Sequence, residues 1–116
     1  MTQKTGPRKE LSVGAEDVVT YDCTRWLDAD ASGTLTELLT GTPTVTSLGP
    51  SGLTISNKAV NTSALYMLNN TVAVGAAIQF KVSGQERGKV YQILLQCYTN
   101  ATVPRKISKI IEIKGV

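Results

Sequence analysis

Residues 88–99 of this chain read GKVYQILLQCYT, and residues 105–116 read RKISKIIEIKGV. Both stretches are rich in the β-branched and aromatic residues that favour strands, and the first alternates between apolar and polar side chains. A short polar segment around Asn100 separates them and has the composition of a turn. The chain therefore ends on two paired β-strands, which predicts a β-module. In the last strand Ile110 and Ile111 are adjacent, so we expect either cover on both faces or a bulge.

Turn-forming residues recur about every ten residues in the rest of the chain, which is the spacing of an all-β sandwich. The segment Gly84 to Gly88 is expected to form a hairpin loop that leads into the strand of Tyr91. Asp28 to Gly33 has the composition of a loop, and residues 34–40 fit either a short helix or a strand. Further strands are expected at residues 8–14, 17–23, 43–47, 53–56, 64–68 and 75–83.

The chain has 116 residues, which is enough for one domain with its own core. Residues 1–7 are polar and end in Gly6-Pro7, which predicts a flexible N-terminal arm ahead of a sandwich domain over residues 8–116. The first ten residues lack the apolar centre of a secretory signal, and no apolar run approaches the ~20 residues that span a bilayer. We therefore expect synthesis in a cytoplasm and no membrane partner.

Alternation along the strands predicts which side chains form the core. The core residues expected from alternation are Tyr21, Phe80, Tyr91, Ile93, Leu95 and Cys97, and Trp26, just beyond its strand, is expected to cap the core under a loop. Tyr91 stands near the start of a late strand, where a tyrosine can place its ring inward and its hydroxyl on the backbone. Cys23 points inward as Cys97 does. A disulfide between them is an alternative, but two free, buried thiols are the expectation for a protein made in a cytoplasm.

The chain contains no histidine, which excludes Ser–His and Cys–His nucleophile pairs and the usual zinc sites. No Gly-rich loop lies between a strand and a helix, so the nucleotide-binding fingerprints are missing too. We therefore expect no catalytic residues, no cofactor and no enzymatic activity.

One loop resembles an EF-hand calcium site. Oxygen ligands stand at its first, third, fifth and ninth positions, which are Asp28, Asp30, Ser32 and Thr36. Leu39 occupies the last position, where such a site needs a bidentate glutamate, and the segment before the loop has the pattern of a strand. We expect a surface turn without a bound metal. Asp28, Asp30 and Glu37 are then solvated loop charges, not a glycosidase pair.

The formal net charge is +3, and much of the excess lies near the two ends of the chain. A charge of this size keeps a small domain soluble, and the basic residues lack the interleaved aromatics of a nucleic-acid surface. We expect no nucleic-acid partner. The residues expected at a protein interface are Lys4, Arg8, Lys9, Gln92 and Gln96. The two glutamines are outward-facing, polar and uncharged, which suits packing on a neighbour.

Several anchors together resemble a family of small Ig-like structural proteins of tailed bacteriophages. They are the strand Asp17–Asp22, the pair Trp26-Leu27, the step Gly88-x-x-Tyr91-x-Ile93, Thr99 and the aliphatic end at Val116. The chain departs from the family's pattern in the loop before Tyr91, which is longer, and in the turn after Thr99. The resemblance implies an Ig-like antiparallel β-sandwich that serves as a non-enzymatic virion component.

Within that family, the resemblance favours a capsid decoration or head-fibre-base protein. Its expected partners are the major capsid protein or other virion structural proteins, bound by a homo-oligomer or by many copies on the particle. It would lie in the virion after synthesis in the host cytoplasm. A neck or tail adaptor is an alternative of the same class. A carbohydrate- or host-surface-binding β-module is the alternative from another class. It would need exposed aromatic rings, and the chain has only one Trp, one Phe and four Tyr.

Overall fold

The computed structural model describes residues 8–67 and 70–116, so the arm expected at residues 1–7 lies outside the described range. The described chain consists of strands, loops and a single 3-10 turn, η1 (Thr24–Trp26). None of its helices is long and apolar enough to cross a membrane. The strands are β1 (Arg8–Leu11), β2 (Asp17–Asp22), β3 (Leu39–Gly49), β4 (Thr54–Val60), β5 (Leu65–Met67), β6 (Asn70–Val72), β7 (Ala77–Ser83), β8 (Val90–Thr99) and β9 (Lys106–Gly115).

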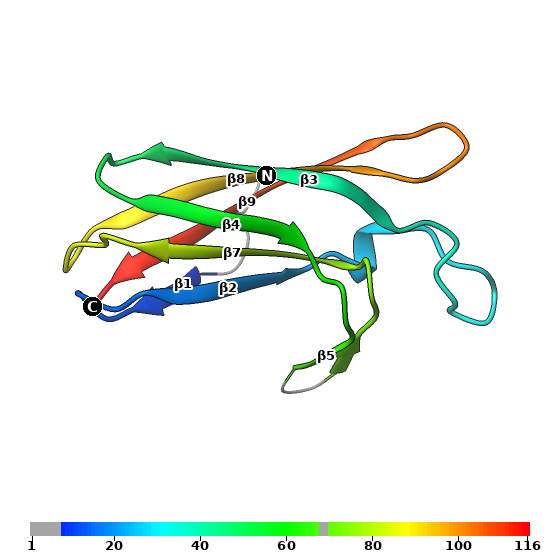
Figure 1. Cartoon of the computed structure of the whole chain (residues 1–116), viewed down its shortest axis with the longest axis horizontal. Coiled ribbons are helices and arrows are strands. Elements are labelled where there is room, and N and C mark those ends of the chain that lie inside the picture. Colours follow the sequence, from blue (N-terminus) through cyan, green and yellow to red (C-terminus); the bar gives the residue numbers. More distant parts are fainter. Residues whose placement is uncertain (1–7, 68–69) are drawn as a thin grey trace, which may run out of the picture.

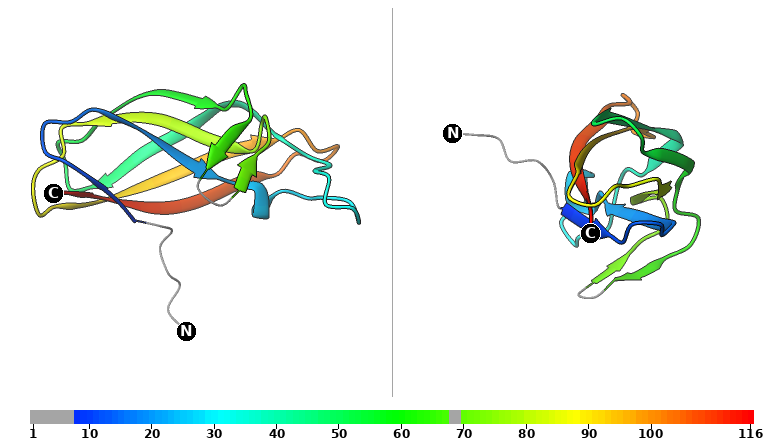
Figure 2. Two further views of the ribbon diagram at one scale, coloured as in Figure 1. Left: turned by 90° about the horizontal axis from the view of Figure 1, so that it is seen from below. Right: turned by 90° about the vertical axis from the view of Figure 1, so that its left-hand side faces the viewer.

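Two sheets pack face to face around the core (Figure 1 and Figure 2). One has the strand order β1-β9-β8-β3, and the other has the order β2-β7-β4. β5 and β6 form a separate hairpin that projects below the sandwich in Figure 1. Pairing is antiparallel except between β1 and β9, which are parallel. The opposition of β2-β7-β4 to β9-β8-β3 is that of an Ig-like sandwich, so the predicted fold class is confirmed.

The C-terminal hairpin forms as the sequence predicts. β8 and β9 pair without any register shift from Val90 opposite Lys114 to Tyr98 opposite Lys106. Because side chains alternate along a strand, odd-numbered residues of both strands face the core and even-numbered residues face outward. The adjacent isoleucines therefore need no bulge. Ile111 is buried, whereas Ile110 lies half-buried on the outer face.

Tyr91 links the core to the backbone in the manner of a tyrosine corner. Its ring is fully buried, at 0% exposure. Its hydroxyl accepts a hydrogen bond from the Glu86 backbone N–H at 3.0 Å. Phe80, on the opposite sheet, is likewise buried at 0% exposure. Burying an aromatic ring of this size stabilises the fold by about 2–3 kcal/mol, and the hydroxyl is satisfied as it is buried.

The hairpin expected at Gly84 to Gly88 is wrong, because β7 and β8 belong to different sheets. The segment crosses from one layer to the other. Gln85 secures the crossing: its buried amide donates to the carbonyls of Ser12 at 2.6 Å and Ala15 at 2.9 Å. Gly84 begins the crossing at φ +84°, where a Cβ would come within 2.6 Å of the Gly52 carbonyl oxygen. Turn composition predicts that the chain changes direction but not which sheet it enters.

Residues 34–40 contain no helix in the structure, and β3 begins within them at Leu39. β3 is also longer than the strand expected at residues 43–47. Its pairing with β8 shifts between Thr40 and Thr44, which hides the alternation that would have indicated a single strand. β4 likewise extends beyond the expected residues 53–56, with a shift between Ser56 and Ala59.

Candidate functional site

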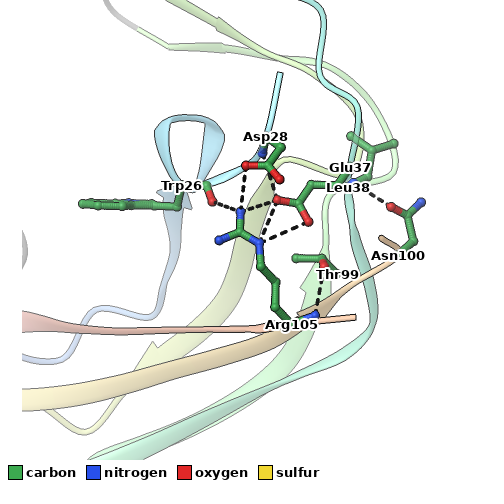
Figure 3. A network of polar contacts seen from close by, with 7 residues as sticks. All are labelled: Trp26, Asp28, Glu37, Leu38, Thr99, Asn100 and Arg105. Atoms are coloured by element: carbon green, nitrogen blue, oxygen red, sulfur yellow. Dashed lines mark hydrogen bonds and ion pairs between the residues drawn. The ribbon is translucent and has the colours of Figure 1, made fainter. Parts of the chain in front are cut away.

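A network of polar contacts joins the loop after η1 to Arg105, just before β9 (Figure 3). At its centre the Glu37 carboxylate, only 2% exposed, is bound by the Arg105 guanidinium. Arg105 Nε donates to Glu37 Oε1 at 3.0 Å and to Oε2 at 3.3 Å, and Arg105 Nη2 makes a further short contact with Oε1. Nη2 also donates to the Trp26 carbonyl at 2.7 Å. The Asp28 backbone N–H also donates to Glu37 Oε1, at 2.8 Å.

Backbone contacts hold this pair, the Glu37–Arg105 clamp, in place. The Leu38 N–H donates to Asn100 Oδ1 at 2.8 Å, and the Asn100 N–H donates to the Leu38 carbonyl at 2.9 Å. The β8–β9 turn is therefore fastened to the residue next to Glu37, as Figure 3 shows. The backbone of Arg105 is held at the end of β8, where the Thr99 N–H donates to the Arg105 carbonyl at 2.9 Å and the Arg105 N–H donates to the Thr99 hydroxyl at 3.4 Å.

The clamp fixes the protonation state of Glu37. Its hydrogen bonds from the Arg105 guanidinium lower the pKa of the carboxyl from 4.5 to about 2, although burial acts in the opposite direction. The same pairing raises the pKa of Arg105. Glu37 is therefore an anion at neutral pH and cannot donate a proton there. Chemically, the arrangement is a structural ion pair that positions a loop and a turn.

The three carboxylates expected as solvated loop charges behave differently from one another. Glu37 is the exception to that prediction, since it is buried and ion-paired. Asp28 is exposed, with Oδ1 at 3.5 Å from Arg105 Nη2. Asp30 is exposed and its pKa is lowered, first by the Ser32 hydroxyl. No local pattern marks Glu37 as buried, because its partner lies 68 residues away in the chain.

The calcium-like loop forms an Asx turn. Asp30 Oδ1 accepts hydrogen bonds from the Ser32 N–H at 2.9 Å, the Ser32 hydroxyl at 2.7 Å and the Thr34 N–H at 3.0 Å. Asp28 turns to Arg105, and Thr36 donates its backbone N–H to the Asp28 carbonyl at 2.8 Å. Within the described part of the chain, no group of three His, Cys, Asp or Glu residues could hold a metal ion. These contacts account for the Asp, Ser and Gly content of the loop.

Trp26 was expected in the core, and that prediction is wrong. The 3-10 turn after β2 places its ring on the surface, at 36% exposure, while the following residue, Leu27, takes the buried position. The indole Nε1–H donates to the Tyr21 hydroxyl at 3.2 Å. Lys109 Nζ lies 3.3 Å from the ring centroid and Arg25 lies 5.5 Å from it. Trp26 therefore belongs to a cation–π cluster beside β9.

The other expected core residues are all buried. Their exposures are 8% for Tyr21, 3% for Cys97 and 0% for Phe80, Tyr91, Ile93 and Leu95. Cys23 and Cys97 are both buried free thiols. Burial raises the pKa of Cys23 to about 12 and raises the pKa of Cys97. Neither thiol is therefore a reactive nucleophile at neutral pH.

The expected interface residues do not share one surface, and Lys4 lies outside the described residues. Arg8 on β1 forms an ion pair with Glu112 on β9, at 2.9 Å, and Glu112 is in turn opposite the exposed Gln92 on β8. These three side chains form a row across the outer face of the larger sheet. Gln96 lies on the same face, with Nε2 3.4 Å from the Ser108 hydroxyl. Lys9 points the other way, toward Asp17 of β2 at 3.8 Å.

Sequence reasoning missed the apolar centre of that outer face. Leu94 and Ile110 are directly opposite each other on β8 and β9, and both are half-buried. Thr46 of β3 lies beside Leu94. The sequence does contain an indication of this apolar centre, in the pairs Leu94-Leu95 and Ile110-Ile111. Because side chains alternate along a strand, one aliphatic residue of each pair must face outward. The register that places the two outward members together became visible only in the structure.

Comparisons with protein-family models, with curated proteins and with solved structures find no match to this chain. The function therefore has to be argued from the surfaces of the molecule.

Proposed function

We propose that this chain is a non-enzymatic structural protein of a tailed-bacteriophage virion, most simply a capsid decoration or head-fibre-base protein. The observation that supports the proposal best is the outer face of the β1-β9-β8-β3 sheet, defined here by Gln92, Leu94, Gln96, Ser108 and Ile110. Its centre is aliphatic, and the neighbouring Gln92, Gln96 and Ser108 are polar but uncharged. Protein interfaces have the same arrangement, with charge depleted at the centre.

Charged side chains stand at the margin of this face. Arg8 and Glu112 neutralise each other there, at 2.9 Å, and Lys106 and Lys114 add positive charge at the two ends of β9 on the same face. A flat face of this kind suits packing on a neighbouring subunit. Many copies on a symmetric particle would gain avidity from contacts that are individually weak. The partner would be the major capsid protein or another virion structural protein, and the chain would reach the virion after synthesis in the host cytoplasm. The sequence resemblance to phage Ig-like proteins supports the same assignment.

The direct test is the composition of particles produced by the phage whose genome encodes this chain. Mass spectrometry of purified virions should detect the chain in many copies, and immunogold labelling should place it on the head. Label at the neck or tail would instead establish the adaptor alternative. Absence of the chain from purified virions would refute the proposal.

A matched pair of variants tests the surface. Leu94→Glu places a charge at the centre of the outer face and should abolish incorporation into particles. Val18→Glu is the control, because Val18 is 49% exposed on β2 of the opposite sheet. Circular dichroism should confirm that both variants fold. Equal incorporation of both variants would remove this face from the interface.

One observation favours the second class of function, a carbohydrate- or host-surface-binding module. Tyr66 on the β5–β6 hairpin is 85% exposed and Tyr98 on β8 is 57% exposed, so more aromatic surface is available than the sequence indicated. Tyr66→Ala should leave virion incorporation unchanged if the chain is a structural tile. Loss of adsorption to host cells with normal incorporation would establish the carbohydrate- or host-binding function.

A further inference from the structure

Among the described residues, nothing pairs with the hydrogen-bonding edge of one half of β9. β1 pairs with β9 only from Glu112 to Gly115, and no other strand in the described residues covers the remainder on that side. We call the uncovered stretch, residues 106–111, the β9 edge. It lies at the margin of the larger sheet, on the opposite side of β9 from β8.

The backbone groups on this edge can be identified from their neighbours. The Thr99 N–H donates to the Arg105 carbonyl, and the Gly115 N–H donates to the Lys89 carbonyl, so odd-numbered residues bond to the β8 side. The Val116 N–H donates to the Leu11 carbonyl, so even-numbered residues bond to the β1 side. Antiparallel pairing keeps this alternation along the strand. The backbone N–H and C=O groups of Lys106, Ser108 and Ile110 therefore point out of the sheet edge.

Positive charge surrounds these open groups. Lys106 starts the edge, Lys109 lies in its middle with Nζ over the Trp26 ring, and Arg25 flanks the same ring. Among the described residues, none of these three cations forms an ion pair, whereas the neighbouring Arg105 is neutralised by Glu37 and Asp28. The edge therefore combines unpaired backbone groups with a local excess of positive charge.

We propose that the β9 edge binds an extended, acidic segment of another protein, which adds a strand beside residues 106–111. Backbone hydrogen bonds to Ser108 and Ile110 would hold such a segment, and carboxylates on it would face Lys106 and Lys109. This inference stands on the edge itself and does not depend on the virion assignment, which concerns the outer face of the sheet.

Charge decides against two other occupants. A second copy of the chain would bring one basic edge against another. The chain's own residues 1–7 include Lys4 and no Asp or Glu, so they offer the edge no negative side chain. Lysines on an edge strand commonly prevent pairing between identical copies. On the β9 edge, the charges that reject another copy also favour an acidic partner, which is how an interface gains specificity.

The first experiment measures amide hydrogen exchange by NMR in the full-length chain without ligand. The amides of Ser108 and Ile110 should exchange rapidly, because they point away from β8. Those of Ile107 and Ile111 should be protected by their bonds to β8. Protection of Ser108 and Ile110 would overturn the proposal, because the edge would already be covered. Loss of that protection on deletion of residues 1–7 would identify the chain's own N-terminal segment as the cover.

The second experiment titrates the chain with an extended glutamate–valine peptide of repeating Glu-Glu-Val-Val, which places carboxylates on both faces of a strand, and with its Lys-Lys-Val-Val counterpart. Amide shifts should map to the β9 edge for the acidic peptide only, and the binding should weaken at high salt. The double variant Lys106→Gln, Lys109→Gln should bind about fivefold more weakly or worse. Lys58→Gln, Arg87→Gln is the matched control, since it removes two positive charges at exposed positions on β4 and in the loop before β8.

Equal weakening in both double variants would show that only net charge matters, which would overturn the proposal. Shifts that map elsewhere, or equal binding of the two peptides, would do the same. If the Lys106→Gln, Lys109→Gln variant self-associated but bound the acidic peptide as well as the wild type, the lysines would only prevent pairing between copies. That result would also overturn the proposal.

Discussion

Replacing Glu37 with glutamine removes the charge at the centre of the Glu37–Arg105 clamp while keeping a side chain of the same shape. The variant should be less stable at neutral pH, because the Arg105 guanidinium loses its buried counter-ion. A pKa of about 2 in place of 4.5 corresponds to at most about 3.5 kcal/mol, at about 1.4 kcal/mol per pKa unit. The Arg105 side chain is 48% exposed, so solvent screens the pair. We expect a loss of about 1–2 kcal/mol in the free energy of unfolding.

The pH dependence gives the sign of the effect. The folded-state pKa of Glu37 is lowered, so its contribution to stability is fully present above pH 4.5 and is lost as the pH falls toward 2. The wild-type free energy of unfolding should therefore decline across this window, and the Glu37→Gln variant should lack that part of the decline. At pH 2 the two proteins should approach equal stability.

Urea unfolding followed by fluorescence measures both quantities. Trp26 is the single tryptophan and its carbonyl contacts Arg105, so its emission reports on the clamp region. Glu112→Gln is the matched control, because the Glu112 side chain is 18% exposed whereas that of Glu37 is 2% exposed, and the change should be worth less than about 0.5 kcal/mol. The reasoning would be refuted if Glu37→Gln cost no more than Glu112→Gln, or if it kept the wild-type pH profile.

Three further predictions concern the core and one turn. Tyr91→Phe should lower the free energy of unfolding by about 1 kcal/mol, because the Glu86 N–H loses its acceptor. Tyr91→Ala should lower it by about 3–5 kcal/mol, because the ring is fully buried. If calorimetry gave a change under about half a kcal/mol for Tyr91→Ala, the ring would have to lie on the surface. The thiol of Cys23 should react with a disulfide reagent only when the protein unfolds, and fast labelling of the native protein would contradict its burial. Because the pKa of Cys23 is raised from 9.0 to about 12 in the folded state, the free energy of unfolding should fall as the pH rises above 9. In thermal melts, Gly84→Ala should destabilise the protein more than Gly33→Ala. Both glycines have positive φ, but only a Cβ at residue 84 would meet backbone, 2.6 Å from the Gly52 carbonyl oxygen. Equal losses would show that the segment between β7 and β8 relaxes to accommodate the Cβ.

The sequence predicts the C-terminal hairpin well because its information is local. Alternation along residues 88–99 places Tyr91, Ile93 and Leu95 inward, and a polar turn separates the two strands. The crossing at Gly84 to Gly88 was missed because a hairpin and a change of sheet use the same turn residues. The choice between them depends on where Gln85 finds its partners, more than 65 residues earlier in the chain.

The candidate site was harder to predict for the same reason. The clamp joins residues 68 positions apart, so neither Glu37 nor Arg105 stands out in its own segment. Trp26 was misplaced because a large apolar side chain next to Leu27 gives two candidates for one buried position. The 3-10 turn decides between them, and its geometry has no clear signature in three residues.

The clamp and the β9 edge can be separated by experiment although they are neighbours. Arg105 directly precedes β9, and its charge is held by Glu37 and Asp28, so the cations left for a partner are Lys106 and Lys109 together with Arg25. Glu37→Gln removes a negative charge near the edge without touching those cations. Under conditions where the variant is folded, it should bind the glutamate–valine peptide at least as tightly as the wild type, although it is less stable. Weaker binding by the folded variant would show that the edge depends on the clamp for its geometry and not on its lysines for their charge.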